Sequence, residues 1–127
     1  KKMSWDGYVD AYFIKNGFDG GAIFGLNGGQ WAAKNLTISS TEIQSIIAGL
    51  SNPNDIRAKG IHAQGVKYFA VQADEEHLLG KKDKTGIIVV KTGKAVGIGI
   101  FDEEKGLSPG NANKFAYDMK DYLCDAG

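Results

Sequence analysis

The chain has 127 residues, of which 43% are hydrophobic and 24% are charged, and this ordinary globular composition argues against a disordered protein. Fifteen basic residues balance fifteen acidic ones, whereas a dedicated nucleic-acid-binding domain is usually strongly basic. The length fits one domain over residues 1–127, and we expect residues 1–3 to be an extension or a disordered start.

The cysteine content and the lengths of the apolar segments exclude further classes of protein. Cys124 is the only cysteine, so no disulfide can form within the chain. No apolar run approaches the roughly 20 residues that span a bilayer. The basic pair at the N-terminus is not followed by the apolar stretch of a signal peptide. These features predict a soluble protein of the cell interior.

The first half of the chain predicts two helices separated by a hairpin. Residues 4–15 place five apolar side chains at the spacing of one helix face. Strands at 22–26 and 30–33 should then form a hairpin, because the Asn-Gly pair between them tolerates positive φ. Residues 39–50 carry a stripe of isoleucine and leucine that predicts the second helix, and the turn residues 51–54 should end it.

The second half of the chain predicts mainly strands before a final helix. The expected strands are residues 60–63, 66–73, 77–82, 86–92 and 94–101. Gly97 and Gly99 share one face of the last strand, where a helix should pack close to the sheet. The final helix is predicted over 108–127, with Ser108 as its cap and Pro109 in its first turn. Strand runs bounded by helices indicate an α+β domain built on an antiparallel sheet.

The inventory of reactive side chains does not point to an enzyme, a cofactor or a metal. His62 and His77 lie far apart in the sequence, and no pair of histidines or cysteines has metal-ligand spacing. Gly97 and Gly99 lack the third glycine of a dinucleotide-binding loop. A lone thiol such as Cys124 is more often incidental than a nucleophile. We therefore expect no catalytic residue, no metal and no cofactor.

Aromatic residues near both ends of the chain are the most informative feature. They are Trp5, Tyr8 and Tyr12 in the first helix, Trp31 on an early strand and Tyr122 in the last helix. Such a stripe usually belongs to the core, but Tyr and Trp also favour half-wet surfaces. Two terminal helices side by side on one sheet face could form a flat aromatic groove. Such grooves bind proline-rich segments, because a polyproline helix is already ordered before it docks.

Several short motifs follow one another along the chain in a recognisable order. They are Met3-Ser4-Trp5-Asp6-Gly7-Tyr8-Val9-Asp10, Trp31, Gly65-Val66-Lys67-Tyr68, Gly80-Lys81-Lys82, the stretch from Lys91 to Asp102, Pro109-Gly110 and Asp121-Tyr122-Leu123. In this combination the chain resembles the profilin family, in the short form of amoebae, fungi and plants. The resemblance implies an α+β fold with a central antiparallel sheet. The terminal helices would pack on one face and shorter helices on the other.

The resemblance also implies a function, which is regulation of actin polymerisation without catalysis. The expected partners of this monomeric protein are monomeric actin, proline-rich segments of cytoskeletal proteins and, weakly, phosphoinositide lipids, but no nucleic acid. The expected location is the cytoplasm and cytoskeleton. The polyproline-binding residues would be Trp5, Tyr8, Trp31, Tyr122 and Leu123. The actin-binding residues would be Lys67, Lys81, Lys82, Lys91, Asn113, Lys114 and Asp118. The phosphoinositide-binding residues would be Lys81, Lys82 and Lys91.

The segment from Lys81 to Lys94 is locally basic, with five lysines and one acidic residue. The lysines could simply protect a solvated strand edge against aggregation. They could equally form a basic patch for an acidic partner such as actin or an anionic lipid headgroup.

Two other classes of function stay open on the sequence alone. A PAS-like or roadblock-like sensory or scaffold domain would have a similar architecture, but it would hold a small ligand in a buried pocket or dimerise through a sheet edge. An enzyme that uses Cys124 is a more distant alternative.

Overall fold

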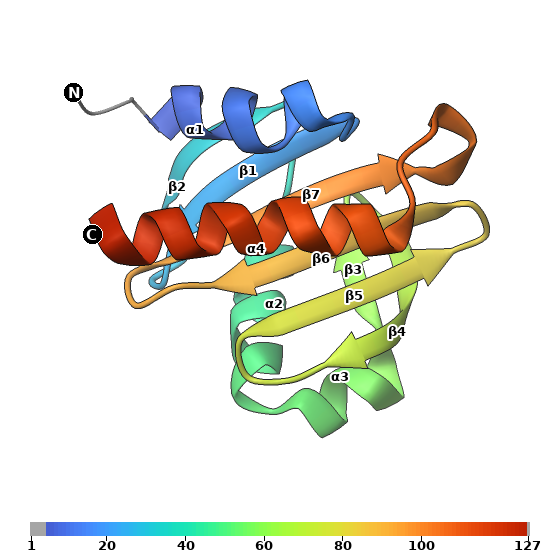
Figure 1. The fold of residues 1–127 in the computed structure, drawn as a ribbon. Helices are drawn as coiled ribbons and strands as arrows, with labels where there is room; N and C mark the ends of the chain where they lie inside the picture. The colour runs from blue at the N-terminus through green and yellow to red at the C-terminus, as the bar shows by residue number, and fades with distance from the viewer. Residues whose placement is uncertain (1–4, 127) are drawn as a thin grey trace.

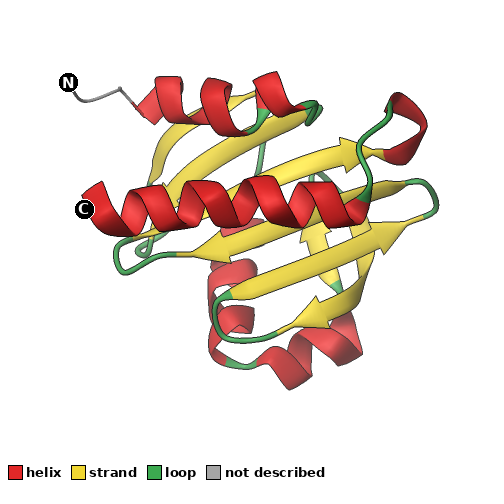
Figure 2. Ribbon diagram, viewed as in Figure 1, coloured by secondary structure: helices red, strands yellow, loops and turns green. Residues whose placement is uncertain are grey.

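The computed structural model describes the backbone of residues 5–126 and the side chains within it, except those of Pro109, Met119 and residues 122–126. The predicted extension at residues 1–3 lies outside the described residues. A central antiparallel sheet carries helices on both of its faces, as Figures 1 and 2 show. No helix among the described residues is long and apolar enough to cross a membrane.

Seven strands form the sheet. They are β1 (Gly20–Gly25), β2 (Gln30–Lys34), β3 (Ile61–Ala63), β4 (Val66–Ala73), β5 (His77–Lys82), β6 (Thr85–Lys91) and β7 (Ala95–Asp102). Their order is β2-β1-β7-β6-β5-β4-β3, and every neighbouring pair is antiparallel. The pairing of β1 with β7 places the start of the chain beside its end.

Among the described residues, four α-helices cover the two faces of the sheet in pairs. They are α1 (Trp5–Tyr12), α2 (Ser40–Ser51), α3 (Pro53–Lys59) and α4 (Pro109–Ala126), and the short 3-10 helices η1 (Ile14–Asn16) and η2 (Glu103–Lys105) precede β1 and α4. The terminal helices α1 and α4 share one face, and α2 and α3 lie on the other (Figure 1). This arrangement confirms the predicted fold class.

The apolar run of β6 explains why both faces must be covered. Successive side chains of a strand point to opposite faces of the sheet. Ile87 and Val89 therefore enter the core under α2, while Ile88 and Val90 enter the core under α1 and α4. All four side chains are fully buried. A continuous apolar strand of this kind is stable only where both faces of the sheet are covered.

One helix boundary differs from the sequence prediction, and one helix was not predicted. The first helix was expected to reach residue 15, but α1 ends at Tyr12 because the Asn16 amide donates hydrogen bonds to the carbonyl oxygens of Tyr12 (3.1 Å) and Ala11 (3.4 Å). Pro53 was expected to begin a loop, but it opens α3. Proline is tolerated in the first turn of a helix, where its missing N–H would have no partner.

The predicted close packing over the glycine face of β7 occurs at Gly99, where aromatic rings approach the backbone. A Cβ atom on Gly99 would lie 2.6 Å from the Phe13 ring and 2.8 Å from the Phe18 ring. Gly21, which pairs with Gly99 across the strands, has the same contact with Phe13. The segment that packs on these glycines is therefore the one that follows α1. Its two phenylalanines, Phe13 and Phe18, pack edge to face.

Gly99→Ala is expected to lower the free energy of unfolding by about 1–3 kcal/mol, because the added methyl group overpacks a core that has no space for it. Urea unfolding followed by circular dichroism measures this change. Gly93→Ala is the matched control, since a Cβ atom there meets nothing within 4 Å. Equal stability of the two variants would contradict this account of the core.

Glu42 joins the start of α2 to the β3–β4 turn. Its carboxylate accepts hydrogen bonds from the backbone N–H groups of Gly65 (2.8 Å), Gln64 (3.0 Å) and Ser39 (3.1 Å). Ser39 in turn caps the helix by accepting from the Glu42 N–H. Burial alone would raise the pKa of Glu42, but these N–H groups outweigh it and hold the pKa below its ordinary value.

Glu42→Gln is expected to lower the free energy of unfolding by about 1 kcal/mol at neutral pH, because one carboxylate oxygen becomes a donor that faces an N–H group. A depressed pKa stabilises the fold above the ordinary carboxyl pKa, and this contribution disappears as the pH falls through the lower folded value. The difference between native protein and variant should therefore shrink below about pH 4.5. Urea titrations across pH measure it, and Glu75→Gln, on an exposed turn, should show no such difference.

Candidate functional site: two exposed aromatic surfaces

The first surface is a pair of tryptophans contributed by α1 and β2. Trp5 is 40% exposed and Trp31 is 38% exposed, and their ring centroids lie 4.7 Å apart. The contact forms because α1 packs across β2, the edge strand of the sheet. The structure therefore brings together two side chains that are 26 positions apart in the sequence, as predicted. Their role in binding remains a prediction.

Tyr8 does not share the exposure of the two tryptophans. It was expected to be partly exposed, but only 4% of its surface is accessible. One helical turn after Trp5, Tyr8 points toward the sheet and joins the core with Val9 and Phe13. The centroid of its ring lies 5.3 Å from the centroid of the Trp5 ring and 6.2 Å from the centroid of the Tyr12 ring. Tyr8 thus supports Trp5 from beneath, and the expectation of an exposed Tyr8 face was wrong.

The side chains of Tyr122 and Leu123 lie outside the described part of the structure. Their backbone belongs to α4, which packs beside α1 on the same face of the sheet. Figure 1 shows the first turn of α1 and the last turn of α4 at the same end of the molecule. Both positions therefore stay predictions for the polyproline groove.

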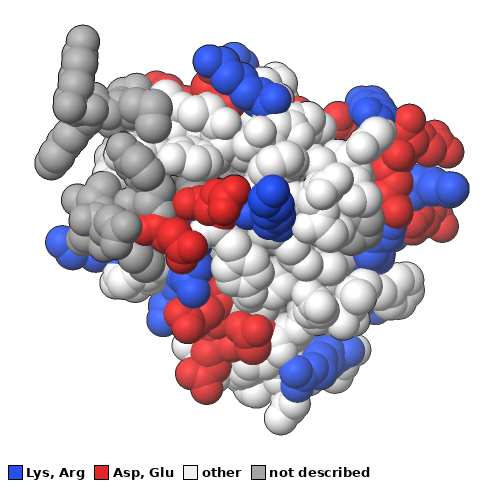
Figure 3. Space-filling view, viewed as in Figure 1, with Lys and Arg blue, Asp and Glu red and all other residues white. Residues whose placement is uncertain are grey.

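The second surface is an uncovered part of β4. Phe69 is 66% exposed and Val71 is 58% exposed. Both side chains lie on the face of the sheet that α4 occupies. However, α4 packs over β6 and β7 and leaves β4 uncovered. In Figure 3 this area is mostly uncharged, with charged side chains at its rim. The sequence analysis missed both residues, although the alternation with the core residue Tyr68 was a usable signal.

A hydrogen-bond network joins this part of the sheet to α4. The Asn113 amide donates to Gln72 Oε1 (3.3 Å), and its Oδ1 atom lies 2.7 Å from Nε2 of the buried His77. The His77 ring stacks on that of Tyr117, with the centroids 5.0 Å apart. Burial raises the pKa of the Tyr117 hydroxyl, and the charge of Asp74 adds to the effect. We call Lys67, Phe69, Val71, Lys81, Asn113 and Tyr117 the β4–α4 surface.

The predicted actin-binding residues fall partly on the β4–α4 surface. The Lys67 ammonium lies 5.3 Å from the centroid of the Phe69 ring, and Lys81 is the cross-strand partner of Phe69. Lys114 and Asp118 are exposed on α4, one and five residues after Asn113. The structure thus places Lys67, Lys81 and Asn113 beside the apolar centre. Lys82 and Lys91 lie elsewhere on the sheet.

The three lysines predicted to bind phosphoinositide do not form one cluster. Lys81 forms an ion pair with Glu103, and Lys82, the next residue on the strand, points to the opposite face. Lys91 lies at the far end of β6, six residues from Thr85 and therefore roughly 20 Å away. Strand parity and strand length therefore separate the three lysines, and their role in lipid binding stays a prediction.

The comparison with known protein families decides between the open classes of function. The profilin family matches residues 3–127. The chain belongs to the profilin family. Profilin-P of Physarum polycephalum is 40% identical over 126 residues, and profilin-1 of Dictyostelium discoideum is 39% identical over 127 residues. Each alignment covers 98% of this chain and 99% of the relative. Profilins bind actin monomers and are not enzymes, so the sensory-domain and enzyme alternatives are set aside.

Solved profilin structures share the fold described above. Acanthamoeba castellanii profilin IB has a TM-score of 0.91 at 32% identity, and Schizosaccharomyces pombe profilin has 0.91 at 33%. Both comparisons cover 98% of this chain and 99% of the other. Mouse profilin IIa, solved in complex with a double repeat from the FH1 domain of mDia1, has the same fold with a TM-score of 0.78 at 22% identity.

Proposed function

We propose that this profilin binds monomeric actin through the β4–α4 surface and proline-rich segments through the Trp5–Trp31 pair. The observation that carries the proposal is the presence of two exposed aromatic surfaces on a sheet whose faces are otherwise covered by helices. The proposed partners place the protein in the cytoplasm, at the actin cytoskeleton.

The tryptophan pair suits a proline-rich ligand. Two half-exposed rings in contact present a rigid apolar platform, and the indole N–H groups can donate to the carbonyls of a polyproline helix. The mouse relative was solved with an FH1-domain repeat, which supports a ligand of this class. Tyr122 and Leu123 are proposed to extend the platform along the last turns of α4.

The β4–α4 surface suits a protein partner. Phe69 and Val71 form an apolar centre, and Lys67, Lys81 and Asn113 supply basic and polar groups around it. Apolar anchors inside a polar rim are typical of protein interfaces. The basic residues match the acidic surface expected of actin.

Both partners should bind at the same time, because the two surfaces are far apart. Four strands separate β2 from β4 in the sheet, so Trp31 and Phe69 lie roughly 24 Å apart. A partner that holds the profilin by a proline-rich segment would then present its actin at a raised effective concentration.

Beads that carry poly-L-proline are expected to retain actin monomers only when this profilin is present. Trp31→Ala should prevent retention on the beads while actin binding in solution is unchanged. Beads that retain the profilin but no actin would contradict two independent sites.

A further inference from the structure

The side-chain amide of Asn113 connects three elements of the β4–α4 surface. Its Oδ1 atom lies 2.7 Å from Nε2 of His77 on β5, and its Nδ2 atom donates to Oε1 of Gln72 on β4 over 3.3 Å. His77 is only 3% exposed, whereas Asn113 is half-buried and Gln72 is exposed. A buried histidine is thus linked to a surface that it does not itself form.

The chemistry of the acceptors sets the direction of these hydrogen bonds. A carbonyl oxygen only accepts, so the contact with Asn113 Oδ1 requires a proton on His77 Nε2. The bond determines which half of the Asn113 amide points inward, since the oxygen faces His77 and the NH2 group faces Gln72. The oxygen and nitrogen of an amide have nearly the same shape. Without a donor such as His77, the group could turn over and exchange its donor for its acceptor.

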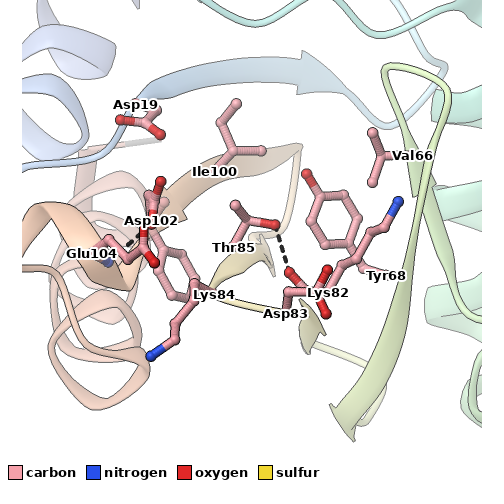
Figure 4. Close-up of a pocket in the computed structure, with 11 residues that line it drawn as sticks. Asp19, Val66, Tyr68, Lys82, Asp83, Lys84, Thr85, Ile100, Asp102 and Glu104 are labelled. Atoms are coloured by element: carbon pink, nitrogen blue, oxygen red, sulfur yellow. Dashed lines mark hydrogen bonds between the residues drawn. The ribbon is translucent and has the colours of Figure 1, made fainter.

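Strand parity defines which side chains of β4 can reach α4. Tyr68 and Lys82 line a groove on the opposite face of the sheet, as Figure 4 shows. Their strand neighbours Phe69 and Lys81 form a cross-strand pair, and this pair therefore faces the α4 side. Strict alternation beyond Phe69 would turn Gln72 away from α4.

A β-bulge in β4 reverses the orientation of Gln72. The register shifts between Ala70 and Gln72, so Val71 is the extra residue and Gln72 pairs with Leu79. The Leu79 side chain lies in the core under α1 and α4, and Gln72 therefore points to the same face. A bulge can re-aim a side chain in this way. Here the re-aimed side chain is the acceptor for Asn113 Nδ2.

Two consecutive turns of α4 hold the His77 ring. Asn113 and Tyr117 are four residues apart and therefore lie on the same side of the helix. Tyr117 stacks on the His77 ring, with the centroids 5.0 Å apart and an interplanar angle of 28°. Lys120, whose ammonium lies 5.8 Å from the centroid of the Tyr117 ring, pairs with Glu76 just before His77. The stacking fixes the plane of the His77 ring and so the direction in which Nε2–H points.

The row of hydrogen bonds from His77 to Gln72 leaves N–H groups at the surface. One hydrogen of Asn113 Nδ2 is used by Gln72, and no residue in the described part of the chain accepts the other. Gln72 Oε1 is occupied by the same bond, so its exposed NH2 group is also available to donate. A partner on this surface must therefore supply acceptors, such as backbone carbonyls or carboxylates, opposite Asn113 and Gln72.

We infer that His77 is a positioning residue of the β4–α4 surface, which holds the Asn113 amide so that its N–H donates to an oxygen of the bound partner. The inference rests on the proposed binding of actin by this surface. His77 acts through Asn113 and does not touch the partner. It thereby gives the surface a preference, because a partner that offers an N–H or ammonium group at this place would meet another donor.

Two variants separate the hydrogen bond of His77 from its stacking. His77→Phe keeps a ring against Tyr117 and removes the donor, whereas His77→Gln places an amide nitrogen near the position of Nε2 and restores it. Each protein is titrated into fluorescently labelled actin monomers. We expect His77→Phe to weaken actin binding about threefold to tenfold, and His77→Gln to stay within about twofold of the native protein.

A double-mutant cycle shows whether His77 acts through Asn113. On an Asn113→Ala background, His77→Phe should have no further effect on the affinity for actin. Ile88→Val is the matched control, because Ile88 is a fully buried residue of the same core that takes no part in these hydrogen bonds. It should lower stability and leave the affinity for actin unchanged, which separates positioning from general destabilisation.

Nuclear magnetic resonance tests the hydrogen bond in the free protein, without actin. A long-range 1H–15N spectrum of the native protein should show a proton on His77 Nε2, and this measurement needs no variant. The Asn113 NH2 resonances should move toward those of an exposed amide in His77→Phe but not in His77→Gln. The spectra also show whether each variant is folded.

The inference is overturned if His77 Nε2 carries no proton, if folded His77→Phe binds actin like the native protein, or if His77→Gln loses as much affinity as His77→Phe. Phe69→Asp, measured beside these variants, distinguishes this inference from the proposed function. If Phe69→Asp weakens actin binding and His77→Phe does not, only the inference on His77 fails. If neither weakens binding, the proposed actin-binding surface fails as well.

Discussion

Trp31→Ala is expected to weaken the binding of a polyproline peptide by roughly 30-fold or more, which corresponds to about 2 kcal/mol. The substitution removes half of the platform and leaves Trp5 without the ring that lies 4.7 Å from it. Central aromatic anchors of an interface typically lose this much when they are truncated. Because Trp31 is 38% exposed on an edge strand, the fold itself should lose little stability.

Isothermal titration calorimetry with a polyproline peptide measures the loss, and the fluorescence of the remaining Trp5 gives a second readout. Gln30→Ala changes the neighbouring exposed residue of the same strand and should bind normally. Normal binding by folded Trp31→Ala would place the proline-rich ligand elsewhere on the molecule.

Phe69→Asp is expected to reduce the affinity for monomeric actin by at least about tenfold, or roughly 1.4 kcal/mol. Burial of a phenylalanine at an interface contributes about 1.5–3 kcal/mol, and the new carboxylate would have to be desolvated without a partner. The change should leave stability nearly intact, because the ring is 66% exposed in the free protein.

The rate and extent of polymerisation of labelled actin report the change in affinity. Ser45→Asp introduces the same charge on an exposed position of α2, on the opposite face of the sheet, and should sequester actin like the native protein. If Phe69→Asp sequesters actin as well as Ser45→Asp does, the uncovered part of β4 is not the actin-binding surface.

Local patterns in the sequence were sufficient for the strands and for α1, α2 and α4, but not for α3. The Asn-Gly turn defines the β1–β2 hairpin, and Gly28 adopts the positive φ of 92° that this turn needs. The unbroken apolar run of β6 requires a sheet covered on both faces. The motifs at both ends were enough to indicate the profilin family and to select Trp5 and Trp31. These features depend on neighbours in the chain, so the sequence displays them directly.

The exposure of individual side chains was decided by the tertiary structure. Helical spacing treats Trp5 and Tyr8 alike, but contact with the sheet buries Tyr8 and leaves Trp5 at the surface. Phe69 and Val71 are exposed because α4 packs over β6 and β7 and does not cover β4. No local pattern in the sequence indicates which strands a distant helix will cover.

The electrostatic surfaces also arise only in the folded chain. The five lysines between Lys81 and Lys94 look like one basic patch in the sequence. In the structure, neighbouring lysines of a strand point to opposite faces, and the length of β6 separates its two ends. Lys81 is also paired with Glu103. The sequence by itself determined most of the elements, since these follow from short-range periodicity and turn chemistry, and its ordered motifs indicated the family. The tertiary structure alone decided which side chains meet solvent or each other, since that depends on long-range packing between the elements.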